Sequence, residues 1–334
     1  MENQLEVFKE VAIEALPKNY QKYLPNQTKT ADFESFWQQT LDELKKIPLH
    51  ITRESVAYPS AYFQVEKITF QSLYSETIVG WYILPKHRTG RIPCLIEYLG
   101  YLSRRGEPFQ YAHWAQLGLA VLVFDVRGQG GDTADSAPYK APTMNFPMGK
   151  GLLKKEDYYQ RRVYCDSVRE IEVACTLEEI DEQAIFLNGA SQGGALALAA
   201  SALTTHSLPF VMADVPSSCD VEKRIQEETG SYQEITQFLR NYPDAETRVL
   251  KVQSYFDLKN FAENIQVPVF ASVGGKDPVC PPLNFCALYN RLTCEKRLSV
   301  YPHNHHDGGG SSHMRKKMQL ITTYLKQQNK FGNK

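Results

Sequence analysis

The chain has 334 residues, of which 43% are hydrophobic and 22% charged, and its formal net charge is −1 with a pI of about 6.7. This composition is ordinary for a globular protein, and the charge balance does not favour nucleic acid or an anionic membrane as a partner. No stretch approaches the roughly 18 uninterrupted apolar residues of a membrane span. Residues 1–16 lack the basic-then-apolar pattern of a secretory signal. We therefore expect a cytoplasmic protein.

The seven cysteines are odd in number and include no CxxC pair. This pattern argues against a disulfide framework or a zinc knuckle. In a reducing compartment such cysteines are mostly small buried hydrophobic residues, and we expect that role here.

The first part of the chain, residues 1–90, is predicted to be an N-terminal extension. Residues 32–47 form an amphipathic helix pattern that Asp32 can cap, and residues 61–71 and 77–85 are strand-like with turn residues between them. We expect this part to contribute one helix and an antiparallel pair of strands.

From residue 92 onward, short apolar runs alternate with helical segments. The expected strands are 92–100, 119–128, 184–189, 210–217, 267–275 and 297–302, and the expected helices include 109–118, 157–177, 193–203 and 312–327. Such alternation is typical of strands buried on both faces of a mostly parallel sheet flanked by helices. We interpret residues 1–334 as a single α/β domain. The segment 217–266 is too long for a simple crossover, which makes it a candidate helical lid or pocket wall.

The sharpest motif is Gly189-Ala190-Ser191-Gln192-Gly193, a G-x-S-x-G pattern between an apolar strand and a helix of small residues. A serine at the tip of a strand-to-helix turn sits in strained backbone, and glycines on either side allow the close approach that the turn needs. The following helix directs its N-terminal amides toward the position where negative charge develops. This context predicts that Ser191 is a nucleophile.

A nucleophilic serine needs a base, and the base needs an orienting carboxylate. Asp277 follows the strand 267–275, and several histidines follow the next strand, so both residue types reach the carboxyl edge of the sheet. Asp214 also follows a strand and is an alternative acid. We interpret Asp125 as a structural residue beside Arg127.

The histidine-rich loop 301–310 raises a competing hypothesis. His303, His305 and Asp307 alternate, and neutral imidazoles at such spacing can bind zinc. A hydrolytic zinc site needs a further ligand cluster, however, and the sequence offers none. We therefore predict no metal and no cofactor.

Several separate stretches resemble the acetyl xylan esterase / cephalosporin C deacetylase family, carbohydrate esterase family seven, over residues 31–325. They are ADFESFW, GWYILP, EYLGY, VRGQGGDT, KGLLKKEDYYQRRVYCDSVREIE, GASQGG, GGKDPVCPPLNFCALYN and VYPHNHHD. The resemblance implies an α/β-hydrolase fold and a ring-shaped homohexamer.

The resemblance also implies roles for individual residues. Counting five residues from Tyr301 gives His306 as the base, with His305 as the main alternative, beside Ser191 and Asp277. The residues implied for other roles are Tyr101 and Gln192 as backbone oxyanion donors, Val215, Pro216 and Ser217 with Tyr101 as pocket walls, and Arg127 and Gln129 as organisers of the loops near the site. Val215 and Ser217 are smaller than the residues of the family pattern, which implies an enlarged or reshaped pocket.

The expected function is therefore removal of acetyl groups from small acetylated substrates, such as xylo-oligosaccharides or cephalosporin C-like esters. A peptidase or a longer-chain esterase would use the same three side chains. Two alternatives use different chemistry. One is a metal-dependent hydrolase built on the loop 303–307, and the other is a hydrolase fold retained only for binding.

Overall fold

The computed structural model describes residues 13–140 and 144–328; residues 1–12, on which most of the prediction about a signal falls, lie outside this part. The described residues form a nine-stranded sheet in the order β1-β2-β3-β5-β4-β6-β7-β8-β9. Strands β1 to β3 are antiparallel, β3 pairs antiparallel with β5, and every neighbouring pair from β5 to β9 is parallel. The predicted fold class, a mostly parallel sheet with flanking helices, is confirmed.

The strands are β1 Thr52–Val56, β2 Phe63–Gln71, β3 Thr77–Pro85, β4 Ile92–Tyr98, β5 Ala120–Phe124, β6 Ile180–Ala190, β7 Val211–Asp214, β8 Val269–Gly274 and β9 Lys296–Tyr301. The helices are α1 Lys18–Gln21, α2 Phe33–Lys45, α3 Ala112–Ala115, α4 Tyr159–Thr176, α5 Gln192–Leu203, α6 Val221–Gln226, α7 Gln233–Asn241, α8 Glu246–Gln253, α9 Pro282–Tyr289 and α10 Gly310–Gln327.

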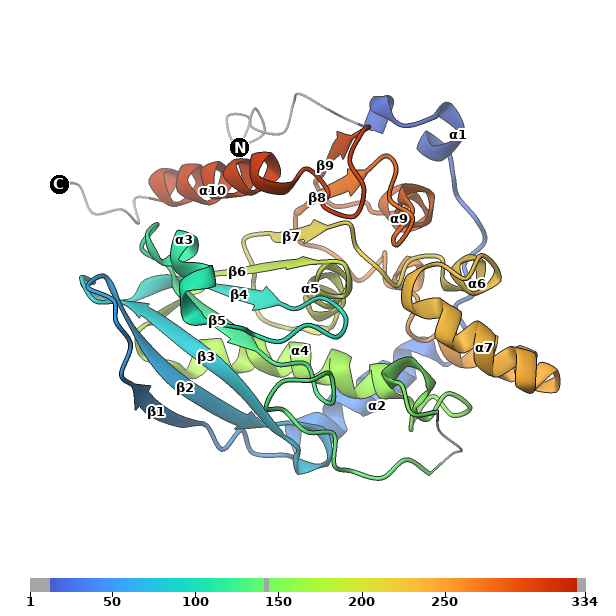
Figure 1. Cartoon of the computed structure of the whole chain (residues 1–334), viewed down its shortest axis with the longest axis horizontal. Helices are drawn as coiled ribbons and strands as arrows, with labels where there is room; N and C mark the ends of the chain where they lie inside the picture. The colour runs from blue at the N-terminus through green and yellow to red at the C-terminus, as the bar shows by residue number, and fades with distance from the viewer. Residues whose placement is uncertain (1–12, 141–143, 329–334) are drawn as a thin grey trace.

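The helices lie on both sides of the sheet. Figure 1 shows α3 and α10 on one side and α4 with α2 on the other. Helices α6, α7 and α8 come from the segment 217–266, and α6 and α7 lie beyond the carboxyl ends of the strands (Figure 1). No helix of the described residues has the length and apolar character that crossing a bilayer requires.

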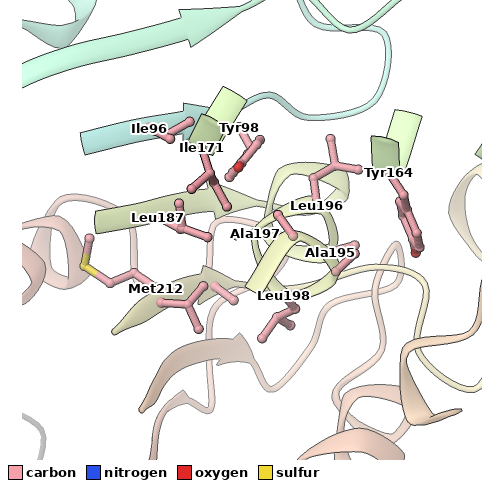
Figure 2. Close-up of a cluster of buried hydrophobic side chains, with 14 of the residues drawn as sticks. Ile96, Tyr98, Tyr164, Ile171, Leu187, Ala195, Leu196, Ala197, Leu198 and Met212 are labelled. Atoms are coloured by element: carbon pink, nitrogen blue, oxygen red, sulfur yellow. The ribbon is translucent and has the colours of Figure 1, made fainter. Parts of the chain in front are cut away.

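The core between the sheet and α4 depends on the small residues of α5. In Figure 2, Ala197 of α5 lies toward Leu187 of β6 and Ile171 of α4, whereas Ala195 lies on the side of α5 away from Leu187. All four side chains are fully buried. Small residues let a helix approach a sheet closely, so this packing holds the start of α5 firmly at the end of β6.

Two local predictions differ from the structure, and one strand was not predicted. Asp32 does not cap α2, because its carboxylate instead binds Lys155 and the Tyr255 hydroxyl. The helix expected over 109–118 is a short 3-10 turn followed by α3, which ends before Gly118. Strand β1 was not predicted, because its side chains are mostly exposed and show no apolar alternation.

Candidate functional site

Ser191 occupies the strained turn between β6 and α5. Its φ is 60° and its ψ is −121°, and its backbone N–H donates to the Asp214 carbonyl at 2.9 Å. A Cβ added to Gly193 would lie 2.1 Å from the Tyr98 carbonyl oxygen, and one added to Gly189 would lie 2.3 Å from Gly193. The motif glycines are therefore required by close backbone approach, and the turn projects Ser191 from the carboxyl edge of the sheet.

Asp277 and His306 form a direct pair. Asp277 follows β8, His306 follows β9, and His306 Nδ1 lies 2.7 Å from Asp277 Oδ2. The other carboxylate oxygen accepts the N–H groups of Val279 and Cys280 at 2.8 and 2.9 Å. The Asp277 side chain is fully buried, whereas that of His306 is 31% exposed. An imidazole held in this way is fixed in orientation while its other nitrogen stays accessible.

Ser191 and His306 line the same cavity, which has a volume of about 700 Å³. Among the described residues no hydrogen bond joins Ser191 Oγ to His306, and the nearest recorded polar neighbour of that hydroxyl is Cys280 Sγ at 4.0 Å. Nucleophile–base contacts are often long without substrate and shorten when it binds. The arrangement therefore suits a serine nucleophile with an imidazole base.

The loop after β4 is fixed over this cavity by Gln129. Leu102, with φ of 57°, donates its N–H to Gln129 Oε1 at 2.7 Å. Gln129 Nε2 donates to Gln192 Oε1 at 2.8 Å and to the Tyr159 hydroxyl at 2.9 Å. Tyr101 and Gln192, the two expected oxyanion donors, both line the cavity. Gln129 is 2% exposed. Its buried side-chain amide therefore connects the loop that carries Tyr101 to the side chain of Gln192.

Asp125 and Arg127 form separate ion pairs near this loop. Asp125, interpreted as a structural residue beside Arg127, forms its ion pair with Arg105, whose guanidinium also contacts Asp132. Arg127 instead forms two hydrogen bonds with Asp166, at 2.5 and 2.6 Å, while its carbonyl accepts the Tyr159 hydroxyl at 2.5 Å. Asp125 and Arg127 therefore each pair with a residue from another part of the chain.

Asp214, the alternative acid, belongs to a buried polar network and does not contact His306. Lys317 Nζ donates to Asp214 Oδ2 at 2.5 Å and to Asn188 Oδ1 at 2.9 Å, and His313 Nε2 lies 2.9 Å from Asp214 Oδ1. Burial by itself raises the pKa of Asp214, but the charges of Lys317 and His313 lower it below its usual range. Sequence reasoning missed this network, although Asn188 and Lys317 are polar residues in otherwise apolar positions.

Of the three neighbouring residues expected to wall the pocket, 215–217, two line the cavity and one does not. Val215 and Ser217 line the cavity, and Ser217 N–H donates to the Ser191 carbonyl at 3.0 Å. Pro216 instead lies toward Gly194, where an added Cβ would be 3.2 Å from its ring. The segment 217–266 supplies a further wall through residues on and around α6 and α7. Its lining residues are Ser217, Ser218, Arg224, Gly230, Ser231, Tyr232, Gln233 and Glu234.

The remaining histidines of the loop do not gather around a common point. Asp307 accepts hydrogen bonds from its own loop, from the Asn304 amide at 2.6 Å and the His305 N–H at 3.1 Å. Within the described ranges, no group of three or more His, Cys, Asp or Glu residues is arranged to hold a metal ion.

Comparisons with known proteins agree with one another. A family model described as acetyl xylan esterase matches residues 11–324. An acetyl xylan esterase structure from Paenibacillus sp. R4 is 33% identical, with a TM-score of 0.88 over 93% of this chain and 100% of that one. Acetyl xylan esterase 1 from Thermoanaerobacterium sp. JW/SL YS485 is 28% identical, with a TM-score of 0.84 over 91% and 99%.

A curated relative, acetyl esterase Axe7A of Xylanibacter ruminicola, is 27% identical over 282 residues. The alignment covers 82% of this chain but only 63% of the relative's length.

Proposed function

Because this chain belongs to the acetyl xylan esterase family, the resemblance drawn from its motifs being confirmed, we propose that it is a serine esterase that removes acetyl groups from small acetylated substrates. The observation that carries this proposal is the placement of Ser191 and the paired His306 on one cavity of about 700 Å³. A cavity of this size suits a small ester more than a polymer chain.

In the proposed mechanism, the Ser191 hydroxyl attacks the ester carbonyl while His306 takes its proton. Asp277 holds the imidazole by its Nδ1 and stabilises the imidazolium that forms. Collapse of the tetrahedral intermediate breaks the bond to the alcohol, which leaves with the proton from His306. Water, deprotonated by the same imidazole, then hydrolyses the acetyl-enzyme and releases acetate.

The backbone amides of Tyr101 and Gln192 are proposed to hold the oxyanion. Two features support this assignment: the Gln129 amide that fixes the loop of Tyr101, and the position of Gln192 at the start of α5. One such donor is worth about 3–4 kcal/mol in the transition state. Arg127 and Gln129 are proposed to organise these loops and not to contact substrate.

A substrate panel tests the proposal. We expect 4-nitrophenyl acetate to be hydrolysed with a higher kcat/KM than 4-nitrophenyl octanoate, and an aminoacyl 4-nitroanilide to be hydrolysed slowly. Acetylated xylo-oligosaccharides and cephalosporin C are the natural-type esters to follow, measured by acetate release. A preference for the octanoate or the anilide would overturn the acetyl assignment in favour of a longer-chain esterase or a peptidase.

We also propose two further properties: a homohexamer, which the family resemblance implies, and a cytoplasmic location, which the sequence led us to expect. The hexamer predicts a molar mass six times that of one chain in light scattering, and a monomer would refute it. The cytoplasmic location predicts recovery in the soluble intracellular fraction of the source cell, and recovery outside the cell would refute it.

A further inference from the structure

The active-site cavity contains a buried cation without an acidic partner. Arg224 of α6 is 1% exposed and lines the same cavity as Ser191. No ion pair joins it to a carboxylate anywhere in the described ranges 13–140 and 144–328. Burying a charge without a counter-ion is costly, so natural proteins normally pair such a group. An anion supplied by a ligand would remove that cost.

The orientation of the Arg224 guanidinium is fixed by the wall behind it. Nε donates to Thr229 Oγ1 at 3.1 Å, and Nη2 donates to the Val279 carbonyl at 2.6 Å. The guanidinium carbon lies 4.6 Å from the centroid of the Tyr232 ring. The guanidinium also forms a hydrogen bond with the Cys280 side chain, at the edge of the cavity. The charge is therefore held in place by neutral groups, none of which is a carboxylate.

The backbone is shaped to let the guanidinium lie there. Gly230 has φ of +56°, and a Cβ added to it would lie 3.0 Å from Arg224 Nη2 and 2.9 Å from the Val279 carbonyl oxygen. A side chain at position 230 would displace the arginine. The glycine at position 230 therefore makes room for the guanidinium in this orientation, which would not be needed for a surface arginine that is merely covered by its neighbours.

The Arg224 guanidinium is separated from the reacting hydroxyl by one side chain. Cys280 Sγ lies 4.0 Å from Ser191 Oγ, and the charge of Arg224 counteracts the rise that burial causes in the pKa of that thiol. The adjoining wall is small and polar, since Ser217 and Ser218 both line the cavity. A substituent only a few atoms from the scissile carbonyl would therefore reach Arg224.

Two carboxylate residues also line the cavity: Glu97, which accepts hydrogen bonds from Trp114 Nε1 and Asn188 Nδ2, and Glu234. Glu234 of α7 accepts the Tyr101 hydroxyl at 2.8 Å, beside the oxyanion loop, and burial raises the pKa of its carboxyl group. No ion pair between Glu234 and Arg224 is recorded among the described residues. The cavity thus has an acidic wall near Tyr101 and a cationic wall near Cys280, so an anion is favoured only at the second.

From these contacts we propose that Arg224 is a specificity-determining residue that binds a carboxylate on the ester substrate, a few atoms from the scissile carbonyl. This inference rests on the proposed esterase function and names the substrate class for it. A planar guanidinium with a fixed orientation is well matched to a carboxylate, to which it can donate two parallel hydrogen bonds. The carboxylate belongs either to the acyl group or to the alcohol.

Matched pairs of esters separate these two sources. On the acyl side, mono-4-nitrophenyl glutarate is compared with its methyl-capped diester. On the alcohol side, 3-acetoxypropanoate is compared with its methyl ester, with acetate release as the readout. We expect kcat/KM for the anionic member of one pair to exceed that of its capped partner by about ten- to hundredfold, as a charge-assisted hydrogen bond allows.

Variants of Arg224 assign the preference to this residue. R224Q is expected to remove most of the kcat/KM preference for the anionic over the capped ester. R224K keeps the positive charge but cannot donate two parallel hydrogen bonds, so it should retain part of that preference. The control is K223Q, which removes one positive charge from the neighbouring residue of α6, where Lys223 pairs with Glu227 at 2.6 Å. K223Q should keep the wild-type ratio.

Two outcomes would overturn the inference. One is a wild-type enzyme without preference for either anionic ester, a result that needs no variant to fold. Another is a loss in R224Q that is equal for anionic and capped esters, which a purely structural arginine would give. Hydrolysis of 4-nitrophenyl acetate without any anion preference overturns this inference alone, whereas failure to hydrolyse every ester of the panel overturns the proposed function as well.

Discussion

Replacing Gly193 by alanine should impair turnover far more than folding. The added Cβ would lie 2.1 Å from the Tyr98 carbonyl oxygen, 0.9 Å inside the 3.0 Å that real Cβ contacts essentially never go below (3.0 − 2.1 = 0.9). Tyr98 is the last residue of β4 and leads directly into the loop that carries Tyr101. The clash must therefore move either that loop or the start of α5 by nearly an ångström.

Misplacing catalytic groups by about 1 Å can cost on the order of 100-fold in rate. We expect kcat of G193A for 4-nitrophenyl acetate to fall by about this factor, with a smaller change in KM. The control is G194A, whose Cβ would meet its nearest atom, the Asp214 carbonyl oxygen, at 3.0 Å. It should keep most of the activity. Circular dichroism and thermal melting establish that both variants are folded. A folded G193A with kcat within about threefold of wild type would refute this reasoning.

Other variants test other parts of the site. D277N should lower kcat by about 10³–10⁴-fold, because the amide favours the wrong imidazole tautomer; a loss below tenfold would contradict the pairing. Q129A should lower kcat about tenfold by releasing the N–H of Leu102, measured with 4-nitrophenyl acetate. K317M should lower the free energy of unfolding in urea by about 3–5 kcal/mol at pH 7, because it removes the buried ammonium that pairs with Asp214 Oδ2 and leaves only the contacts of His313 and Ser272 with Oδ1. Since the pKa of Asp214 is depressed, the stability that it contributes is present above its usual 3.8 and is lost as pH falls below that value. The difference between wild type and K317M should therefore shrink in acid, and a difference that grows would contradict the assignment. Finally, EDTA should leave activity unchanged, and a loss restored by zinc would favour the metal hypothesis.

Much of the fold follows from the sequence because apolar runs and glycines carry strong local signals. The runs around Val121, Leu187 and Val269 form buried parallel strands, as expected from their lack of alternation. Strand β1 carried no such signal, because its side chains are mostly exposed and it is held by backbone pairing and by polar pairs such as Thr52–Thr69 and Arg53–Glu66. The turn at Ser191 was visible because steric contacts at both glycines leave few other residues possible.

The sequence could not show which distant charges meet. Asp125 and Arg127 are neighbours along the chain, yet Asp125 binds Arg105 and Arg127 binds Asp166. Arg224 has no motif around it, and its significance appears only when the wall of the cavity and its missing counter-ion are seen together. Such pairings depend on how separate elements pack, which local patterns do not record.

The account depends on one reactive hydroxyl, and covalent trapping tests it directly. The protein is treated with a fluorophosphonate, its intact mass is measured, and the modified peptide is mapped. We expect one adduct per chain on Ser191, loss of acetate hydrolysis in step with labelling, and an S191A variant that is unlabelled and at least about 10³-fold slower. An S191A protein that still hydrolyses 4-nitrophenyl acetate at the wild-type rate, or an adduct on another residue, would contradict the account.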